Sequence, residues 1–254
     1  MRLAVKIAYQ GKGLAGSQIQ PGVKTVQSEI LNDISKVDKS SKPDLRMAGR
    51  TDSGVRALGN VIAVTTSFKD PEKFLKALNA ISSSVYYRSY AVVDETFNPR
   101  HATERIYHYI LPSENLDIGR MSECARLFVG EHDFKRFCRA DERSTIVDMH
   151  SVIVSENGSA VTIEFRADHF LWNMIRRITA AIRSVGQGRS LDDVGDALKG
   201  KDVTFGLARP DALTLMDVLY EGVEFINVPI PGKRTEEERF TNLLDHVFLE
   251  SLDN

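Results

Sequence analysis

The sequence predicts an α+β protein made of two similar halves. Apolar residues alternate or recur at helical spacing in the same order twice along the 254 residues, as strand, helix, strand, strand, helix, strand. This order is the split βαβ arrangement of a ferredoxin-like unit. We therefore expect two ferredoxin-like (βαββαβ) halves, over residues 1–98 and 99–226, whose antiparallel sheets join around a central cleft.

The elements of the first half follow from its apolar pattern. A strand is expected over Leu3–Tyr9. A helix over Thr25–Val37 is indicated by Val26, Ile30 and Ile34, which recur at helical spacing. The remaining elements of this half are strands near 44–49 and 60–66, a helix near 71–80 and a strand near 86–93.

The second half repeats the pattern with a longer second helix. The expected elements are a strand over Arg105–Leu111, a helix over Ile118–Val129, strands over 147–155 and 159–167, a helix from about 170 to 187 and a strand near 213–222. We find no convincing identity between the residues of the two halves, so the repeat is one of pattern only.

Residues 227–254 are expected to form a linker and an acidic C-terminal helix. Two prolines and a glycine in V-P-I-P-G at 228–232 interrupt regular structure. Thr235 and Glu238 then have the spacing of a capping box. The apolar stripe of the helix is Phe240, Leu243, Leu244, Val247 and Phe248. We expect this helix to pack on the body of the protein or on a partner subunit.

The composition is typical of a globular protein, with 42% hydrophobic and 27% charged residues. No apolar stretch approaches the roughly 18 residues that span a bilayer. The N-terminus has no signal-peptide cleavage pattern, so we expect a cytoplasmic protein without a membrane partner. Cys124 and Cys138 lack metal-ligand spacing, and Cys124 falls in a helical apolar stripe typical of a core residue.

The charge distribution qualifies the small net charge of −2, which by itself argues mildly against a nucleic-acid partner. Residues 235–254 hold six acidic side chains and one arginine, a net of −5, so the rest of the chain carries about +3. Arginines cluster at 100–105, 136–143 and 176–189. Such local clusters can contact RNA phosphates.

The segment A-G-R-T-D-S-G-V-R-A at 48–57 is the most distinctive feature of the chain. It places Asp52 on a turn between Arg50 and Gly54, just before an apolar strand. An aspartate held at such a junction can act as a nucleophile or as a proton shuttle. The alternative is an ordinary Asp-Ser-Gly turn without chemistry.

The same segment resembles the G-R-T-D-[AS]-G-V signature of the tRNA pseudouridine synthase A family, in which the aspartate is essential. Six further blocks resemble that family in the same order, as far as about residue 222. The resemblance implies two ferredoxin-like halves with a central RNA-binding cleft. It also implies a homodimer that acts on the anticodon stem-loop of tRNA, without a metal or a cofactor.

The segment from Phe97 to Tyr109 contains F-N-P-R-H-A and R-I-Y-H-Y, which resemble the family's F-[HN]-[AP]-R and R-x-Y-x-Y blocks. On a strand, residues 105, 107 and 109 share one face, and His108 points away. The resemblance makes Tyr107 the tyrosine that lies against the target uracil, with Arg100 and Arg105 as substrate-binding residues. A tyrosine in a half-buried strand is the alternative. His101 and His108 have no evident third ligand, so no metal is expected.

The segment F-L-W-N-M-I-R-R at 170–177 resembles the family's F-L-x-x-M-[VI]-R block. The apolar stripe of the predicted helix leaves Arg176 and Arg177 on the opposite side, and a solvated face is the alternative. The resemblance implies that Arg176 pairs with Asp52 and fixes its orientation. Arg177 is expected to contact phosphates, and Arg50 to hold the extruded base or fill its place.

Several positions depart from the family pattern, and three of them bear on the expected RNA contacts or on the last block. Ser17 replaces an aromatic residue, Val147 an arginine and Arg209 a proline. RNA contacts from the first two positions are therefore lost or moved. In L-F-V-G-E-H-D-F at 127–134, which resembles the family's L-x-G-x-H-D-F, Gly130 is expected to cap a helix before a tight turn, and His132 to be structural.

Two other functions are compatible with parts of the sequence. G-K-G-L-A-G at 11–16 matches G-x-G-x-x-G, but Pro21 and Gly22 break the chain before any helix, so no nucleotide cofactor is expected. A non-catalytic RNA-binding protein of ferredoxin-like units is the main rival, and no RNP1-like motif supports it. The family resemblance implies instead an enzyme that cleaves the N1 glycosidic bond of uridine in tRNA and rejoins the ring at C5.

Overall fold

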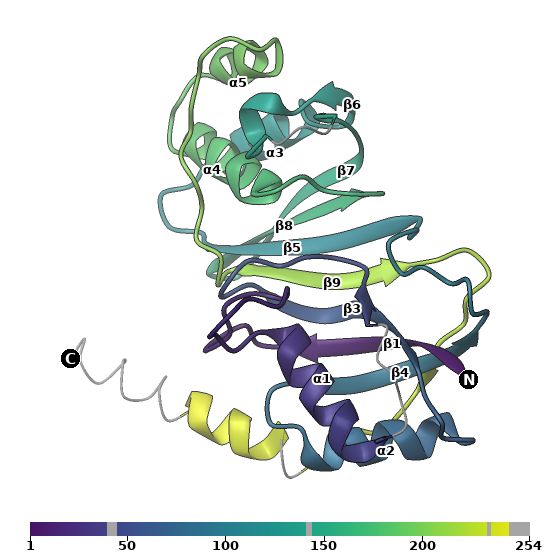
Figure 1. The fold of residues 1–254 in the computed structure, drawn as a ribbon. Helices are drawn as coiled ribbons and strands as arrows, with labels where there is room; N and C mark the ends of the chain where they lie inside the picture. The colour runs from purple at the N-terminus through teal and green to yellow at the C-terminus, as the bar shows by residue number, and fades with distance from the viewer. Residues whose placement is uncertain (40–44, 141–143, 233–234, 244–254) are drawn as a thin grey trace.

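One large sheet runs through the whole molecule (Figure 1). The computed structural model describes residues 1–39, 45–140, 144–232 and 235–243. Within these ranges the strands are β1 (Arg2–Tyr9), β2 (Arg46–Met47), β3 (Arg56–Thr65), β4 (Tyr86–Val93), β5 (Glu104–Pro112), β6 (Gly130–Asp133), β7 (Ile146–Asn157), β8 (Ala160–Ala167), β9 (Leu213–Leu219) and β10 (Ile226–Asn227).

The strands are hydrogen-bonded in the order β10-β4-β1-β3-β9-β5-β8-β7-β6. Strand β2 pairs with Ile62 and Ala63 of β3. Among the described residues every pairing is antiparallel except that of β3 with β9. This short parallel contact pairs Arg56 with Thr214 and Ala57 with Leu215. It joins the strands of the first half of the chain to those of the second half, and it follows directly on the segment that carries Asp52.

The helices form two groups that lie at opposite ends of the sheet (Figure 1). The described helices are α1 (Val26–Val37), α2 (Pro71–Ile81), α3 (Ile118–Arg126), α4 (Met174–Gly186), α5 (Leu191–Leu198) and the 3-10 turn η1 (Lys135–Phe137). Helices α1 and α2 pack together near β4, and α3 packs on α4 and β7. The predicted α+β class is therefore confirmed, with a mostly antiparallel sheet.

Local sequence signals explain where the helices start. Thr25 caps α1 and exchanges hydrogen bonds with Ser28 in a capping box. Asp70 caps α2, whose first residue is Pro71. Asp117 caps α3 by accepting from the backbone N–H of Arg120 at 2.9 Å. These caps satisfy amide groups that the first helical turn leaves without partners.

Two predicted boundaries in the second half were wrong. Helix α3 ends at Arg126 rather than near 129, and Gly130, with φ +96°, begins strand β6 instead of capping a helix. Helix α4 begins at Met174 rather than near 170, because Asn173 adopts a left-handed conformation that a helix cannot continue through. Helix α5 and the short strands β6 and β10 were not predicted.

The C-terminal helix is helical at Gly232 and over residues 235–243. Thr235 is itself helical, and its hydroxyl donates to the carbonyl of Gly232 at 2.9 Å, so the predicted cap at Thr235 was wrong. Glu238 docks the helix on the body by accepting from Gln10 at 2.6 Å and from the hydroxyl of Tyr86. Phe240 is exposed, as is Leu243. The rest of the predicted stripe, Leu244, Val247 and Phe248, lies outside the described residues.

The core is continuous from one half to the other. Strand β1 is almost completely buried, and Phe128, Phe134 and Phe137 pack ring against ring beneath α3 and α4. Cys124 belongs to this core, as predicted, and burial raises the pKa of its thiol to about 12. In the described part of the chain, no helix has the length and apolar character needed to cross a membrane.

Candidate active site

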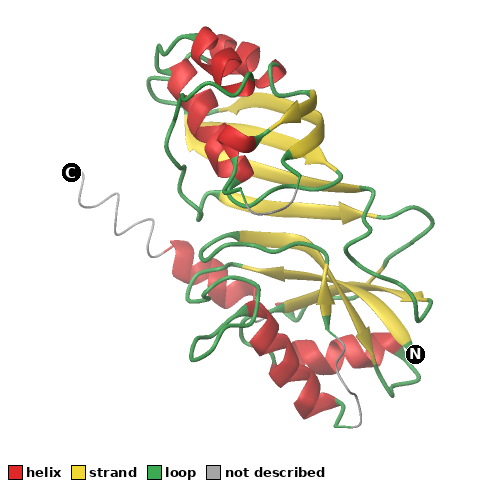
Figure 2. Cartoon of the chain, turned by 45° about the horizontal axis from the view of Figure 1, so that its top comes forward, coloured by secondary structure: helices red, strands yellow, loops and turns green. Residues whose placement is uncertain are grey.

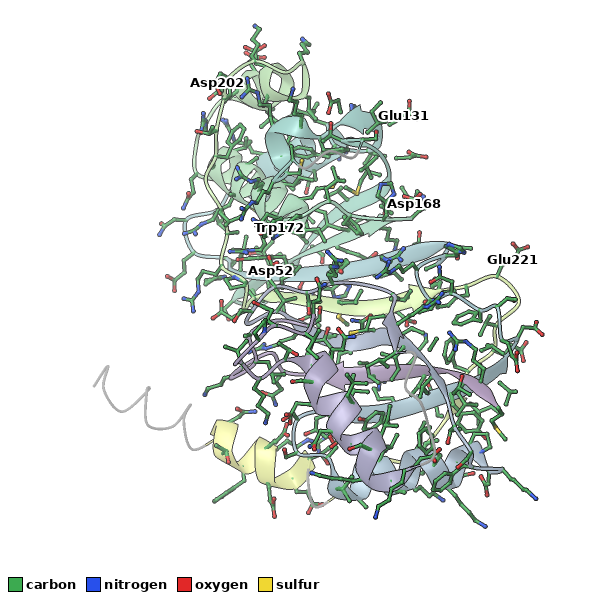
Figure 3. The ribbon with its side chains drawn as sticks, viewed as in Figure 1. Asp52, Glu131, Asp168, Trp172, Asp202 and Glu221 are labelled. Atoms are coloured by element: carbon green, nitrogen blue, oxygen red, sulfur yellow. The ribbon has the colours of Figure 1, made fainter. Side chains whose placement is uncertain are left out.

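Asp52 lies on the loop 48–55, between β2 and β3, where the strands of the two halves of the chain meet (Figure 3). Figure 2 shows the strands of both halves between the two groups of helices. Ser17 holds this loop from one side. Its hydroxyl accepts from the backbone N–H of Thr51 at 2.8 Å, and its own N–H donates to the carbonyl of Thr51 at 3.0 Å. The hydroxyl of Ser53 donates to the carbonyl of Leu14 at 3.0 Å. The residues on both sides of Asp52 are thereby tied to the segment 14–17.

The glycines of the G-K-G-L-A-G segment allow this close approach. Gly11 has φ +73°, and a Cβ there would come within 2.3 Å of the carbonyl oxygen of Val55. Gly16 has φ +93°, and its Cβ would lie 3.0 Å from the carbonyl oxygen of Thr51. Both positions therefore need glycine for backbone packing against the Asp52 loop. No helix opens at Gly16, since α1 begins only at Val26.

A buried polar network supports the loop from below. The hydroxyl of Tyr9 lies 2.9 Å from that of Thr51 and accepts from the amide of Asn60 at 3.1 Å. Asn60 also bonds both backbone groups of Gly49, donating at 3.0 Å and accepting at 3.2 Å. Burial raises the pKa of Tyr9 and keeps its hydroxyl neutral. The network fixes the loop at two points, Gly49 and Thr51.

Arg176 pairs with Asp52 across the join between the two halves. Its Nη1 donates to Oδ2 of Asp52 at 3.0 Å, and the side chains are 14% and 33% exposed, respectively. The same Nη1 is 3.1 Å from Oδ1 of Asn173, and Nε donates to the carbonyl of Ala208 at 2.7 Å. Arg176 is thus held by the loop before α4 and by the segment before β9. The Nη1 atom that contacts Asn173 also donates to Asp52.

The position of Arg176 in the first turn of α4 calls for an anion. The positive end of a helix dipole disfavours a cation and favours an anion. The carboxylate of Asp52 supplies that negative charge, and it also satisfies a guanidinium that is largely removed from water. Asp52 and Arg176, which are 124 positions apart in the sequence, therefore neutralise each other's charge where the two halves of the chain meet.

Tyr107 is buried on β5 with its ring edge-on to Phe170, the two ring centroids 5.2 Å apart. Arg105, Tyr107 and Tyr109 are buried while His108 faces the other side of the sheet, as the strand alternation predicted. A Cβ on Gly49 would lie 3.5 Å from the Tyr107 hydroxyl, so the tyrosine reaches the start of the Asp52 loop. Burial raises the pKa of Tyr107 well above its usual value, and the charge of Asp52 adds to the shift.

Arg105 has a role that the sequence did not suggest. Its buried guanidinium donates to the carbonyls of Ala48 and Arg100, both at 2.9 Å, and to the carbonyl of Asp168. It therefore joins the Asp52 loop to two loops of the second half. Arg100 and Arg50, by contrast, are exposed. Arg177 is half-buried, and its Nε is buried without a hydrogen-bond partner.

The positions that depart from the family pattern have structural explanations. Val147 is buried in β7. Arg209 is exposed and paired with Asp211 at 2.6 Å. Ser17 anchors Thr51, as described above. His132 lies 3.1 Å from the carbonyl of Val129. Among the described residues, no group of three or more His, Cys, Asp and Glu side chains could hold a metal ion.

The sequence prediction missed several residues that shape the site. Asn173 and the carbonyl of Ala208 hold Arg176, and Asn60 holds Gly49. The only signal for Asn173 is its residue type, since asparagine adopts the left-handed conformation more readily than most other residues. A backbone carbonyl such as that of Ala208 leaves no signal in a sequence.

Comparison with known proteins shows the family of the chain. Residues 7–99 and 124–221 match the profile of the family described as tRNA pseudouridine synthase. A tRNA pseudouridine synthase A of Pyrococcus abyssi is 38% identical, with 98% of this chain and 97% of the relative covered. One of Methanosarcina acetivorans is 36% identical, with 97% and 95% covered.

A comparison of folds gave more distant similarities. A solved structure of a Cbf5-Nop10-Gar1 complex matches with a TM-score of 0.37 and 13% identity, covering 71% of this chain and 45% of the other. At that level it contributes nothing to the assignment, which stands on the sequence matches along almost the whole chain. The chain belongs to the tRNA pseudouridine synthase family.

Proposed function

We propose that this enzyme converts uridine to pseudouridine in the anticodon stem-loop of tRNA, and that Asp52 is its essential catalytic residue. Isomerisation of uridine in tRNA is the reaction of the family to which the chain belongs. The observation that supports Asp52 is its ion pair with Arg176, on a loop that backbone contacts hold in place. A side chain fixed in this way is pre-organised for chemistry.

The proposed reaction exchanges one bond of the base for another. The bond between N1 of uracil and C1′ of the ribose breaks, the ring turns, and C5 bonds to C1′. The hydrogen of C5 leaves as a proton, and N1 takes up a proton, so that the product is an isomer of uridine. Asp52 drives the glycosidic cleavage, and Arg176 keeps the carboxylate aimed at the reacting nucleotide.

The target uridine must leave the base stack before it reaches Asp52. Tyr107 would lie against the extruded uracil, and the exposed Arg50 would fill the vacated space or hold the base. Arg100, whose side chain is exposed, and Arg177, which is half-buried, would contact phosphates. We assign Arg105 to positioning the Asp52 loop, since its guanidinium is occupied by three carbonyls.

We further propose that the sheet consists of two ferredoxin-like halves with the RNA between them. Strand orders β4-β1-β3-β2 and β9-β5-β8-β7 support this, because both correspond to the order 4-1-3-2 of a βαββαβ unit. In this proposal residues 1–98 carry Asp52, residues 99–226 carry Arg176 and Tyr107, and residues 227–254 form the linker and acidic helix.

We expect a homodimer, as in the family, and a cytoplasmic location where tRNA is available. The exposed Phe240 and Leu243 of the C-terminal helix offer apolar surface that a partner subunit could cover. Sedimentation velocity at working concentration should give a mass near twice 28.4 kDa. A species of monomer mass under those conditions would contradict this part of the proposal.

The proposed function is tested by mapping the product. Unmodified tRNA transcripts are incubated with the enzyme, and pseudouridine is located by carbodiimide labelling and primer extension. We expect modification confined to the anticodon stem-loop. Pseudouridine elsewhere in the tRNA would refute the proposed region, and tRNA binding without any product would favour the rival, a non-catalytic RNA-binding protein.

A further inference from the structure

An exposed tryptophan lies beside the proposed active site, and no step of the proposed reaction uses it. Trp172 is 50% exposed, although tryptophan is a residue that folding usually buries in large part. It lies on the loop between β8 and α4, and Figure 3 shows it on the same side of the molecule as Asp52. An exposed aromatic ring close in sequence to site residues of an RNA-modifying enzyme is a candidate surface for stacking a base.

The neighbours of Trp172 connect it to the site. Two residues earlier, Phe170 packs its ring against Tyr107 at 5.2 Å. One residue later, Asn173 shares the Nη1 of Arg176 with Asp52, at 3.1 and 3.0 Å. The loop thus contacts the site through the residues on both sides of Trp172, and the indole occupies the rim between them.

Arg139 prepares the indole for a planar partner. Its guanidinium carbon lies 4.0 Å from the centre of the Trp172 ring, so one face of the indole is covered by a cation. The backbone N–H of Arg139 donates to the carbonyl of Trp172 at 2.8 Å, which also fixes the loop. Among the described residues no aromatic ring stacks on Trp172, and the half-exposed side chain is open to a ligand.

We propose that Trp172, with Arg139 behind it, is the stacking platform for an unpaired base next to the target uridine. Extrusion of the target into the site leaves its neighbour without a stacking partner. An indole face provides a replacement for any base, and the adjacent guanidinium adds attraction to the nearby phosphate. Trp172 would therefore stabilise the open form of the RNA and contribute to substrate binding. This proposal rests on the proposed reaction at Asp52.

The chain offers a direct test, because Trp172 is its only tryptophan. When the protein is excited at a wavelength that tyrosine does not absorb, the emission therefore reports on this residue alone, and a base stacked on the indole quenches it. Wild-type protein and Asp52→Ala are titrated with unmodified tRNA, while filter binding measures saturation independently and free N-acetyltryptophanamide corrects for absorption. We expect strong quenching that follows saturation in both proteins. A saturated complex with unchanged emission would overturn the proposal.

Substitutions separate stacking from a purely structural role. Trp172→Leu should weaken tRNA binding about ten-fold, whereas Trp172→Phe should retain most of the affinity because it keeps an aromatic face. Ile153→Ala, at an exposed apolar position on β7, is the control and should bind like the wild type. Equal affinity of the leucine and phenylalanine variants would contradict stacking. If Asp52→Ala showed both the quenching and full turnover, the catalytic role of Asp52 would be refuted, whereas base stacking on Trp172 would still be supported.

Discussion

The start and the tip of the Asp52 loop are held in different ways. At its start, Ala48 and Gly49 are fixed through their backbone by Arg105 and Asn60, both of which are buried. At its tip, the side chain of Asp52 meets Arg176 through one ion pair, and a third of it remains exposed. Rigidity is thus built into the backbone, while the reacting carboxylate stays accessible.

The two arginines of this comparison come from the second half of the chain but do different work. Arg105, on strand β5, makes only contacts with carbonyls, so it acts on the position of the loop. Arg176, on helix α4, contacts the carboxylate itself. We infer that loss of Arg105 is felt first in stability, and loss of Arg176 first in turnover.

Among the residues that hold Asp52, Arg176 should give the largest effect. Arg176→Ala removes the donor that orients the carboxylate, and we expect the single-turnover rate constant to fall about 10²- to 10³-fold, as for loss of one pre-organised donor elsewhere. The measurement is rapid-quench analysis at saturating enzyme. Binding of tRNA should change little, and an unchanged rate constant would refute the ion-pair role.

Arg105→Ala should chiefly lower the free energy of unfolding. Three carbonyl groups lose a buried donor, and we expect a loss of about 2–4 kcal/mol, measured by urea denaturation. Arg100→Ala is the matched control, since its side chain is exposed, and it should cost less than about 0.5 kcal/mol. If the two variants were equally stable, the anchoring role of Arg105 would be wrong.

The sequence predicted the main elements and the meeting of Asp52 with Arg176, the latter only through the family resemblance. It did not predict the anchors. Arg105 reads as one more basic residue on a strand, and nothing local shows that its guanidinium turns inward to three carbonyls. Strands β6 and β10 are too short to give a pattern, and the late start of α4 depends on the backbone of Asn173.

The pH dependence of turnover tests the burial of Tyr107. An exposed tyrosine ionises near pH 10. Because burial raises the pKa of Tyr107, its hydroxyl should stay protonated and the rate should show no loss from its ionisation as the pH rises from 7 to 10. Tyr107→Phe supplies the reference profile. A fall in wild-type rate with a midpoint near 10, absent from the phenylalanine variant, would contradict this assignment.

The smallest effect is expected on the opposite side of the sheet. Glu164 pairs with Arg166 at 2.8 Å and His108 at 2.9 Å, and its hydrogen bond with Arg166 chiefly lowers its pKa. Ionised Glu164 therefore contributes to the free energy of unfolding at pH values above the pKa of glutamate in the unfolded chain, about 4.3. This contribution is lost as the pH falls through the lower pKa of the folded protein.

Glu164→Gln should therefore cost at most about 1 kcal/mol of unfolding free energy at pH 7, with screening by solvent included. The difference from wild type should vanish in acid, and turnover at pH 7 should be unchanged. A stability loss as large as that of Arg105→Ala would show that this ion pair on the sheet surface stabilises the fold as much as the Arg105 anchor does, which would contradict the comparison.

The most direct test of the account is tritium release from unmodified tRNA labelled at C5 of uracil, with wild type and Asp52→Ala compared at equal tRNA occupancy. Bond formation at C5 must expel the label. We expect release by the wild type and a loss on the order of 10⁴-fold or more in the variant, with binding retained. Release by Asp52→Ala at a rate near that of the wild type would show that another residue carries the reaction.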